Sequence, residues 1–379
     1  MILEYGAKNF FCFKEWISVS FKLSANCPEY VSKGKSVSKI LCVKGANAAG
    51  KTNALKVLAF LREFVVNSFN YKPDEEIKIE SFFNNDDPIE FYVEFFQDDK
   101  VFRYELVLNK AGVISEVVYK KQKRSIKSIE RKNDKITART SEYKELDVIK
   151  LRRNASLIST ANQYEIGKIG PIYNFFKSII PNVTYGGLSE KMIDVGQASR
   201  LYHQFPDHFL FAKDIIKKCD LGIKDIVIHS KKEEDGTEIF FPIFYYGVDG
   251  SEKLLTFYSQ SSGTKSLYLQ LGFYKAVLDV GGLLVFDEFD INLHPHILPV
   301  LLDTFTDDHI NVNDAQIIFT THNSEILDFL GKYRTILVNK DENQCYGYRL
   351  DEIPGDIIRN DRPLSPLYNA GKIGGVPKI

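Results

Sequence analysis

Long apolar runs and paired cysteines are both missing from this sequence. A membrane-spanning helix needs about 20 consecutive apolar residues, and no run approaches that length. The N-terminus, MILEYGAKNFF, also lacks the basic-then-apolar layout of a secretion signal. The five cysteines are scattered singly, with no CxxC and no short Cys/His cluster: Cys12, Cys27, Cys42, Cys219 and Cys345. Neither zinc nor a disulfide framework is indicated, and we expect a globular protein of the reducing cytoplasm with no membrane contact.

An excess of charge of either sign is missing as well. The 379 residues carry 49 Lys and Arg against 50 Asp and Glu, a formal net charge of −1. Composition therefore excludes polyanion binding by the chain as a whole, and any basic surface must be local. No repeat or sustained heptad is visible, which argues against a long coiled coil. The length suits two domains or one large α/β unit with an insertion.

A phosphate-binding motif occupies residues 45–52, which read GANAAGKT. The G-x-x-x-x-G-K-T spacing lets consecutive backbone N–H groups turn inward around phosphates. Lys51 adds a point charge for the terminal phosphates, and Thr52 offers a hydroxyl to Mg²⁺. An apolar run precedes the motif and helical spacing follows it, so an ordinary glycine turn is the weaker interpretation. Nucleotide contacts are expected along the whole stretch: Gly45, Ala46, Asn47, Ala48, Ala49, Gly50, Lys51, Thr52 and Asn53.

Two adjacent carboxylates follow a second buried strand in residues 282–295, GLLVFDEFDINLHP. At the C-terminal end of a strand, Asp287 can order a magnesium shell and Glu288 can polarise the attacking water. A salt-bridged strand end is the plain alternative. A P-loop upstream favours the catalytic interpretation, with Glu288 as the base.

Two further stretches flank this strand. Residues 259–266, SQSSGTKS, form a Ser/Gly-rich turn that opens a helix; it is either a second phosphate site or a plain capped loop. Residues 316–323, QIIFTTHN, end an apolar strand in His322, where an imidazole could sense the γ-phosphate. A structural histidine is the alternative, although its place at the end of the next strand favours a catalytic role.

The middle of the chain is less specific. Alternating patterns over 77–136 predict an antiparallel β region, 155–230 is expected to be largely helical, and strands return at IFFPIFYYGV. Residues 119–154 are basic, and both a solvated hairpin followed by a helix and a nucleic-acid contact stay open.

The order of these motifs resembles the ATPase heads of the ABC superfamily, on the SMC and RecF side. Within this group, the chain resembles the AAA-type ATPases of bacterial abortive-infection systems, which are relatives of the OLD ATPases. Four segments carry this resemblance: QSSGTKSL, FDEFDINLHP, FTTHNSEILD and YNAGKIGGVPKI. The likeness is tightest over 1–60 and 250–379. It implies a D-loop role for Asp290 and nucleotide contacts in trans from the SSGT turn, Ser261, Ser262 and Gly263. The usual LSGGQ is QSSGT here, and no Q-loop stands out; Gln163 is the nearest match for a metal contact, with Gln97 as its rival.

The resemblance implies an α/β fold: an ABC-type P-loop ATPase head with an antiparallel β region and a helical insertion between its halves. The expected division is 1–110, the N-terminal half with the P-loop; 111–250, the β/helical insertion; and 251–379, the C-terminal half. ATP and Mg²⁺ are the implied cofactors, and a head-to-tail homodimer is the implied assembly.

Three functions fit such a head: an anti-phage ATPase that controls a separate toxic effector such as a nuclease, a RecF/SMC-like DNA-repair ATPase, and a transporter subunit. No membrane-facing feature supports the third. The 57 residues after His322 (323–379) are too few for an added nuclease domain, so the chain is expected to be the ATP switch and the effector a separate protein. The segment RPLSPLYNAGKIGGVPKI is either packed on its own head or a docking surface for that partner.

Overall fold

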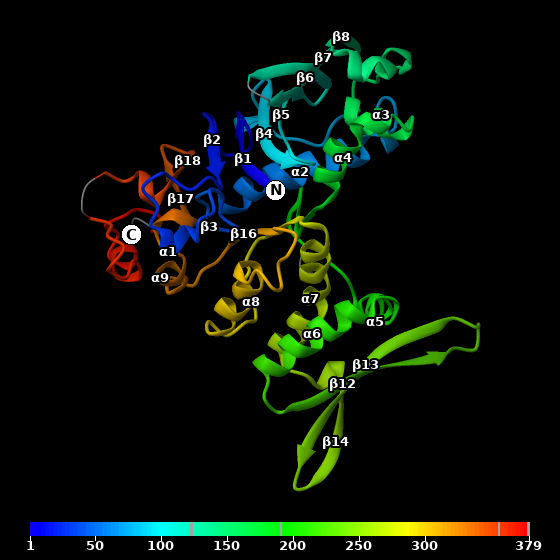
Figure 1. Cartoon of the computed structure of the whole chain (residues 1–379), viewed down its shortest axis with the longest axis vertical. Coiled ribbons are helices and arrows are strands. Elements are labelled where there is room, and N and C mark those ends of the chain that lie inside the picture. The colour runs from blue at the N-terminus through cyan, green and yellow to red at the C-terminus, as the bar shows by residue number, and fades with distance from the viewer. Residues whose placement is uncertain (122–123, 190–191, 355–356, 377–379) are drawn as a thin grey trace.

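Two large sheets enclose one long helix in the computed structural model, which describes residues 1–121, 124–189, 192–354 and 357–376. Helix α2 (Lys51–Asn67) packs its apolar side chains against strands of both sheets in one core. Figure 1 shows a bundle of helices below the sheets and a β arm projecting from that bundle. The expected α/β head with an antiparallel β region is confirmed.

The six-stranded sheet has the order β18-β17-β3-β16-β15-β9. Its strands are β3 (Ile40–Gly45), β9 (Ile179–Pro181), β15 (Leu283–Phe286), β16 (Gln316–Thr320), β17 (Thr335–Asp341) and β18 (Gln344–Arg349). All pairs are parallel except β17 with β18. Because parallel strands end at a common edge, the P-loop, Asp287 and the loop of His322 leave the sheet together.

The seven-stranded sheet is antiparallel, with the order β2-β1-β4-β5-β6-β7-β8. Its strands are β1 (Ile2–Lys8), β2 (Ile17–Ser20), β4 (Ile89–Gln97), β5 (Lys100–Asn109), β6 (Gly112–Lys121), β7 (Ser125–Lys132) and β8 (Lys135–Arg139). The expected domain boundary near residue 110 falls in the hairpin between β5 and β6, which pair along their length. A boundary at this point would separate two paired strands of one sheet, and the division into three parts stays a prediction.

The remaining helices pack around the sheets and in the lower bundle. They are α1 (Glu29–Ser32), α3 (Leu157–Gln163), α4 (Gly170–Lys177), α5 (Val195–Gln204), α6 (Pro206–Cys219), α7 (Ser262–Val280), α8 (Ile297–Thr306), α9 (Ile326–Leu330) and α10 (Ser365–Asn369). None of the helices in the described ranges is long and apolar enough to cross a membrane.

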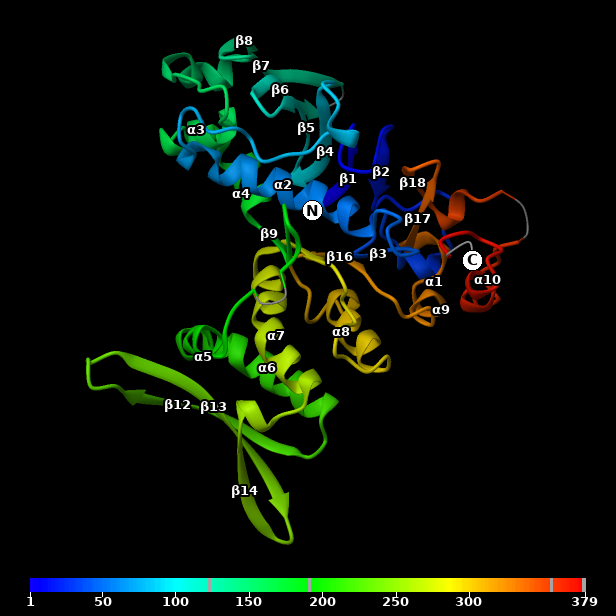
Figure 2. The same ribbon diagram turned by 180° about the vertical axis from the view of Figure 1, so that it is seen from behind.

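The arm consists of β12 (Ile223–Lys232), β13 (Glu238–Val248) and β14 (Ser251–Thr256). Residues 155–230 are thus less helical than expected, because they also contain β9, the small hairpin β10–β11 (Val183–Thr184 and Gly187–Leu188) and β12. The short apolar run of β9 is only three residues long, and pairing with β15 makes it a strand. Figure 2 shows β9 from behind, above α7.

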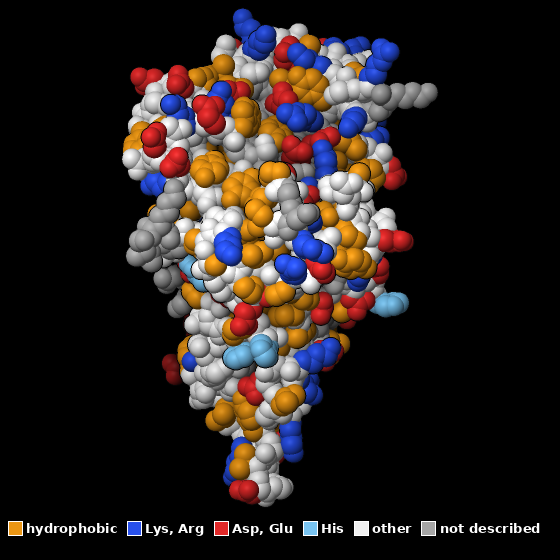
Figure 3. All heavy atoms as spheres, turned by 90° about the vertical axis from the view of Figure 1, so that its left-hand side faces the viewer, with side chains coloured by type: hydrophobic (Ala, Val, Ile, Leu, Met, Phe, Trp, Pro, Cys, Tyr) orange, Lys and Arg blue, Asp and Glu red, His pale blue; other side chains and the backbone are white. Residues whose placement is uncertain are grey.

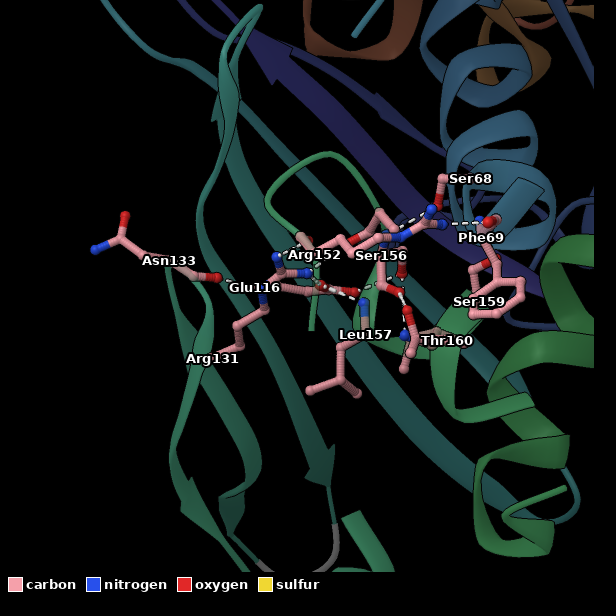
Figure 4. A network of polar contacts seen from close by, with 12 residues as sticks. Ser68, Phe69, Glu116, Arg131, Asn133, Arg152, Ser156, Leu157, Ser159 and Thr160 are labelled. Atoms are coloured by element: carbon pink, nitrogen blue, oxygen red, sulfur yellow. Dashed lines mark hydrogen bonds and ion pairs between the residues drawn. The ribbon is translucent and has the colours of Figure 1, made fainter. Parts of the chain in front are cut away.

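Basic and acidic side chains are interspersed over the surface drawn in Figure 3, and the arm forms its narrow lower end. Part of the basic segment 119–154 points inward. Arg131 is fully buried, and it forms a 3.2 Å ion pair with Glu116, which is also buried. Glu116 also accepts hydrogen bonds from the Ser156 hydroxyl (2.6 Å) and the Leu157 N–H (2.8 Å) (Figure 4). This network ties β6 and β7 to the chain before α3, so these charges serve packing.

The C-terminal segment packs on its own head. Leu364, Tyr368 and Ile373 are buried in a cluster with Leu327 and Leu337, which belong to α9 and β17. The own-head interpretation of this segment is therefore confirmed over the residues described, and Pro377–Ile379 lie outside them. Its apolar side chains are not the exposed surface that a docking role would need.

Candidate nucleotide site

The P-loop connects β3 to α2 with two residues in the left-handed region, Ala48 (φ 61°) and Gly50 (φ 101°). A Cβ at Gly45 would lie 2.3 Å from the carbonyl oxygen of Val338, so only glycine fits against β17 there. Gly50 precedes the first helical residue, Lys51, so the N–H groups of the first turn of α2 face the loop. This backbone is shaped to cradle an anion.

Lys51 folds back over that loop. Its Nζ donates hydrogen bonds of 3.1 Å to the carbonyl oxygens of both Gly45 and Ala46. Burial lowers the pKa of the Lys51 amine, and the carboxylates of Asp287 and Glu288 oppose that shift. The ammonium thus lies where a phosphate held by the loop would be neutralised.

Asp287 lies at the centre of the polar contacts in the site. Its Oδ2 accepts a 2.6 Å hydrogen bond from the Thr52 hydroxyl, and its Oδ1 accepts a 2.5 Å bond from the Thr320 hydroxyl. The side chain of Asn182, just after β9, clamps the Asp287 backbone: Oδ1 accepts from the N–H (2.7 Å) and Nδ2 donates to the carbonyl (2.9 Å). Asp287 and Thr52 therefore present adjacent oxygen ligands, which are the kind that Mg²⁺ prefers.

Glu288 adopts a strained backbone with φ 50° directly after β15. Its N–H donates a 2.8 Å bond to the Thr320 hydroxyl, which fixes the turn. Within the described part of the chain, its carboxylate has no hydrogen-bonding partner, in contrast to that of Asp287. A half-buried carboxylate with free lone pairs is suited to accept a proton from water.

The loop of His322 is fixed on two sides. The Asp290 carboxylate accepts hydrogen bonds of 3.2–3.3 Å from the backbone N–H groups of His322 and Asn323. The buried Lys44 donates to three successive carbonyl oxygens, those of Thr321 (3.2 Å), His322 (3.1 Å) and Asn323 (3.2 Å). His322 itself is exposed, two residues after the end of β16.

The SSGT turn begins α7 and contacts the loop after β15. Ser261 caps α7, because its Oγ accepts a 3.1 Å bond from the Thr264 N–H. A Cβ at Gly263 would lie 2.9 Å from the Asn292 carbonyl oxygen. Among the described residues, the side-chain hydrogen bonds of this turn reach Asp220 and none reaches the P-loop of the same chain.

The prediction that Gln163 lies near the magnesium site is wrong. Gln163 ends α3, and α3 is bound to the far end of α2, where the Ser159 Oγ contacts the Val66 carbonyl at 3.2 Å. At 1.5 Å per residue, that end lies roughly 20 Å from Thr52. The rival Gln97 is also remote, because it ends β4 beside the start of β1, whereas Gly50 of the P-loop packs against Cys12, after the end of β1.

Sequence reasoning missed three residues of the site: Lys44, Asn182 and Thr320. Lys44 carried a usable signal, since a lysine in the buried strand ILCVKG needs acceptors. Thr320 is one threonine among several, and its contact with Asp287 depends on the pairing of β15 with β16. Asn182 lies more than a hundred residues before Asp287 and nothing in the local sequence indicates the clamp.

The fold and this geometry define a P-loop ATPase head. Over residues 40–328 the chain matches the family described as "AAA domain, putative AbiEii toxin, Type IV TA system". The chain belongs to that family. No curated protein matches it.

Among the solved structures to which the chain is similar are two SMC heads. One is the SmcHead bound to the C-winged helix domain of ScpA, with 14% identity, a TM-score of 0.50 and coverage of 92% of this chain and 96% of that one. The other is the SMC head domain from Thermotoga maritima, with 13% identity, a TM-score of 0.46 and coverage of 92% and 98%. The likeness to SMC heads was expected from the sequence and is confirmed.

Proposed function

We propose that the chain binds ATP and hydrolyses it as one subunit of a bacterial anti-phage system, in which ATP-dependent pairing of two heads controls a separate toxic effector. The observation that carries the hydrolysis step is the pairing of Asp287 with Thr52. This contact joins the end of β15 to the start of the P-loop helix and leaves the adjacent Glu288 free. Mg²⁺, when bound, would neutralise phosphate charge at these oxygens.

Backbone and side-chain groups of the protein carry out the other steps of binding and hydrolysis. The loop N–H groups and Lys51 hold the phosphates, Glu288 takes the proton of the attacking water, and Lys44 and Asp290 keep the His322 loop in place. Each group lies on the common edge of the parallel sheet, so positioning costs little rearrangement. The described hydrogen bonds of the SSGT turn do not reach its own P-loop, and this supports a contact with the nucleotide of a second copy.

The effector proposal has separate support, from the family to which the chain belongs. The SmcHead structure was solved with a bound domain of ScpA, which makes a partner protein reasonable for a head of this fold. The test is co-expression with the product of the neighbouring gene, followed by copurification with and without ATP. Copurification that depends on ATP, together with phage resistance that is lost in Lys51→Ala, is expected.

A RecF/SMC-like repair ATPase is the competing function. A chain that copurifies with no neighbour, and whose Lys51→Ala variant leaves phage resistance intact, would contradict the defence proposal and favour repair. The interspersed charges in Figure 3 give the surface drawn there no uniformly basic character, and the buried Arg131 removes one charge from the basic segment. A surface that binds a nucleic-acid duplex would need clustered basic side chains.

A further inference from the structure

Two of the five cysteines, far apart in sequence, meet beside the P-loop. Cys12 lies in the turn between β1 and β2, and Cys345 lies in β18. The N–H of Cys345 donates a 2.9 Å hydrogen bond to the carbonyl oxygen of Cys12. This bond brings the two backbones into direct contact, and a disulfide needs such proximity, with Cα atoms about 4.4–6.8 Å apart.

Their sulfur atoms converge on one glycine of the P-loop. A Cβ built on Gly50 would lie 2.7 Å from the sulfur of Cys12 and 3.2 Å from the sulfur of Cys345. Both sulfurs are therefore within 3.2 Å of a single point, and Gly50 is packed against the pair. The next residue of the nucleotide motif after Thr52 also takes part, because the Asn53 amide donates a 3.2 Å bond to the Cys12 sulfur.

We propose that Cys12 and Cys345 form a reversible disulfide under oxidation by a peroxide, and that this bridge weakens nucleotide binding at the P-loop. The part that concerns nucleotide rests on the proposed function. The cysteines are free in this structure, and Cys12 is partly exposed whereas Cys345 is buried. Cys12 is therefore the sulfur that an oxidant in solution reaches first.

The thiol environment supports that order. The neighbouring Cys345 thiol lowers the pKa of Cys12, against its burial and with help from the Asn53 amide. The same contact raises the pKa of Cys345. Thiolates are the nucleophiles in such reactions, so Cys12 attacks and Cys345 resolves.

The reaction balances with hydrogen peroxide as the oxidant. The Cys12 thiolate attacks one peroxide oxygen and the O–O bond breaks, which leaves a sulfenic acid on Cys12 and releases hydroxide. This hydroxide takes up a proton, equivalent to the one that Cys12 lost on ionising, and becomes the first water. The Cys345 sulfur then attacks the sulfenic sulfur, the S–O bond breaks, and the departing hydroxide takes the proton of Cys345 as a second water. Each sulfur loses one electron, and the peroxide gains two.

The bridge acts on the nucleotide site through two contacts. It makes the Cys12 sulfur a weaker acceptor for the Asn53 amide, and it draws the two sulfurs together against Gly50, which has a φ of 101° at the start of α2. Displacement of Gly50 moves the N–H groups that would hold the phosphates. By linkage, a nucleotide that binds the reduced protein more tightly must oppose the bridge by the same factor.

The experiment treats the full chain with hydrogen peroxide and maps linked peptides by mass spectrometry, which needs no nucleotide. A Cys12–Cys345 peptide that dithiothreitol removes is expected. Affinity for a non-hydrolysable ATP analogue should fall about fivefold or more on oxidation and recover on reduction. Cys219→Ser, in α6 and away from the site, is the matched control and should respond as the wild type does.

Cys12→Ser and Cys345→Ser should lose both the linked peptide and the oxidation-dependent change in affinity. Cys12→Ala replaces either variant if circular dichroism shows that it is unfolded. A folded protein that forms no such peptide, or a change in affinity that persists in Cys12→Ser, would overturn the proposal. A bridge that leaves affinity unchanged would overturn its control of the P-loop. Reduced protein that binds no nucleotide at all would instead refute the proposed ATPase function.

Discussion

The hydroxyl of Thr320 donates a 2.5 Å hydrogen bond to the carboxylate of Asp287. The same hydroxyl oxygen accepts the N–H of Glu288 at 2.8 Å, so one side chain on β16 positions both acidic residues at the end of β15. Because the strands are adjacent and parallel, this contact holds the proposed magnesium ligand and the proposed base in fixed relation. Removal of the Thr320 hydroxyl should therefore disturb the positions of Asp287 and Glu288 more than it disturbs nucleotide binding.

Thr320→Val keeps the shape of the side chain and deletes the hydroxyl. We expect ATP hydrolysis to fall by roughly 10–100-fold, the usual range for loss of a partner that orients a metal ligand. Nucleotide affinity should change less, because the P-loop and Lys51 are untouched. Steady-state hydrolysis and equilibrium binding measure the two effects.

The matched control for Thr320→Val is Thr304→Val in α8. Thr304 is also buried, but among the described residues its hydroxyl bonds only within its own helix, to the Leu301 carbonyl. A comparable loss of hydrolysis in both variants would show that the effect comes from general destabilisation.

Asn182→Ala should impair both stability and turnover. It leaves the buried N–H and carbonyl of Asp287 without partners, which costs about 1–3 kcal/mol in the free energy of unfolding. Asn311→Ala is the control, since Asn311 is also buried and clamps the Ala315 backbone at the start of β16, the end away from the P-loop. Both variants should unfold at a lower denaturant concentration than the wild type, whereas only Asn182→Ala should lower the rate of ATP hydrolysis per folded molecule. Equal hydrolysis in the two variants would contradict the clamp's role.

Lys44 gives a pH dependence of stability. Burial lowers its pKa below the ordinary 10.5, and the charges of Asp290 and Cys42 only partly oppose this, while Lys51 adds to it. Between the lowered pKa and 10.5 the unfolded chain binds more protons than the folded one, so stability from this residue rises with pH. In urea unfolding, the free energy of unfolding of the wild type should therefore rise relative to that of Lys44→Met as the pH is raised toward 10.5. A difference that shrinks over the same interval would be evidence against a buried, charged Lys44.

The SSGT turn predicts sites shared between two chains. Lys51→Ala removes the phosphate charge, and Ser261→Arg blocks the turn, so each variant alone should be inactive. A mixture should recover about a quarter to a half of the activity per dimer, because one of the two sites in a mixed two-fold dimer is intact. Restored hydrolysis on mixing is the expected result. Two folded variants that stay inactive together would show that the sites are not shared.

The motifs with strong local constraints were predictable from sequence. The P-loop, the strand before Asp287 and the strand ending near His322 each combine a buried apolar run with a polar end, and the parallel sheet brings these ends to one edge. The C-terminal segment shows the limit of this reasoning. Its apolar residues fit either packing or docking, and only the cluster around Tyr368 shows that they are packed.

Contacts across long sequence separations could not be predicted. Asn182 reaches Asp287 because three residues of β9 add to the sheet edge, and a run that short has no reliable pattern. Gln163 was chosen by analogy of position, yet α3 packs against the far end of α2. Cys12 and Cys345 lie far apart in the sequence, and only the fold brings their sulfur atoms together against Gly50.

The most direct test of the central claim is single-turnover ATP hydrolysis by Glu288→Gln, with nucleotide affinity measured on the same preparation. The glutamine keeps the shape of the side chain and loses the proton acceptor, so affinity should be retained while hydrolysis falls on the order of a hundredfold or more. Hydrolysis at the wild-type rate in this variant would contradict the assignment of Glu288 as the base and the ATPase mechanism built on it.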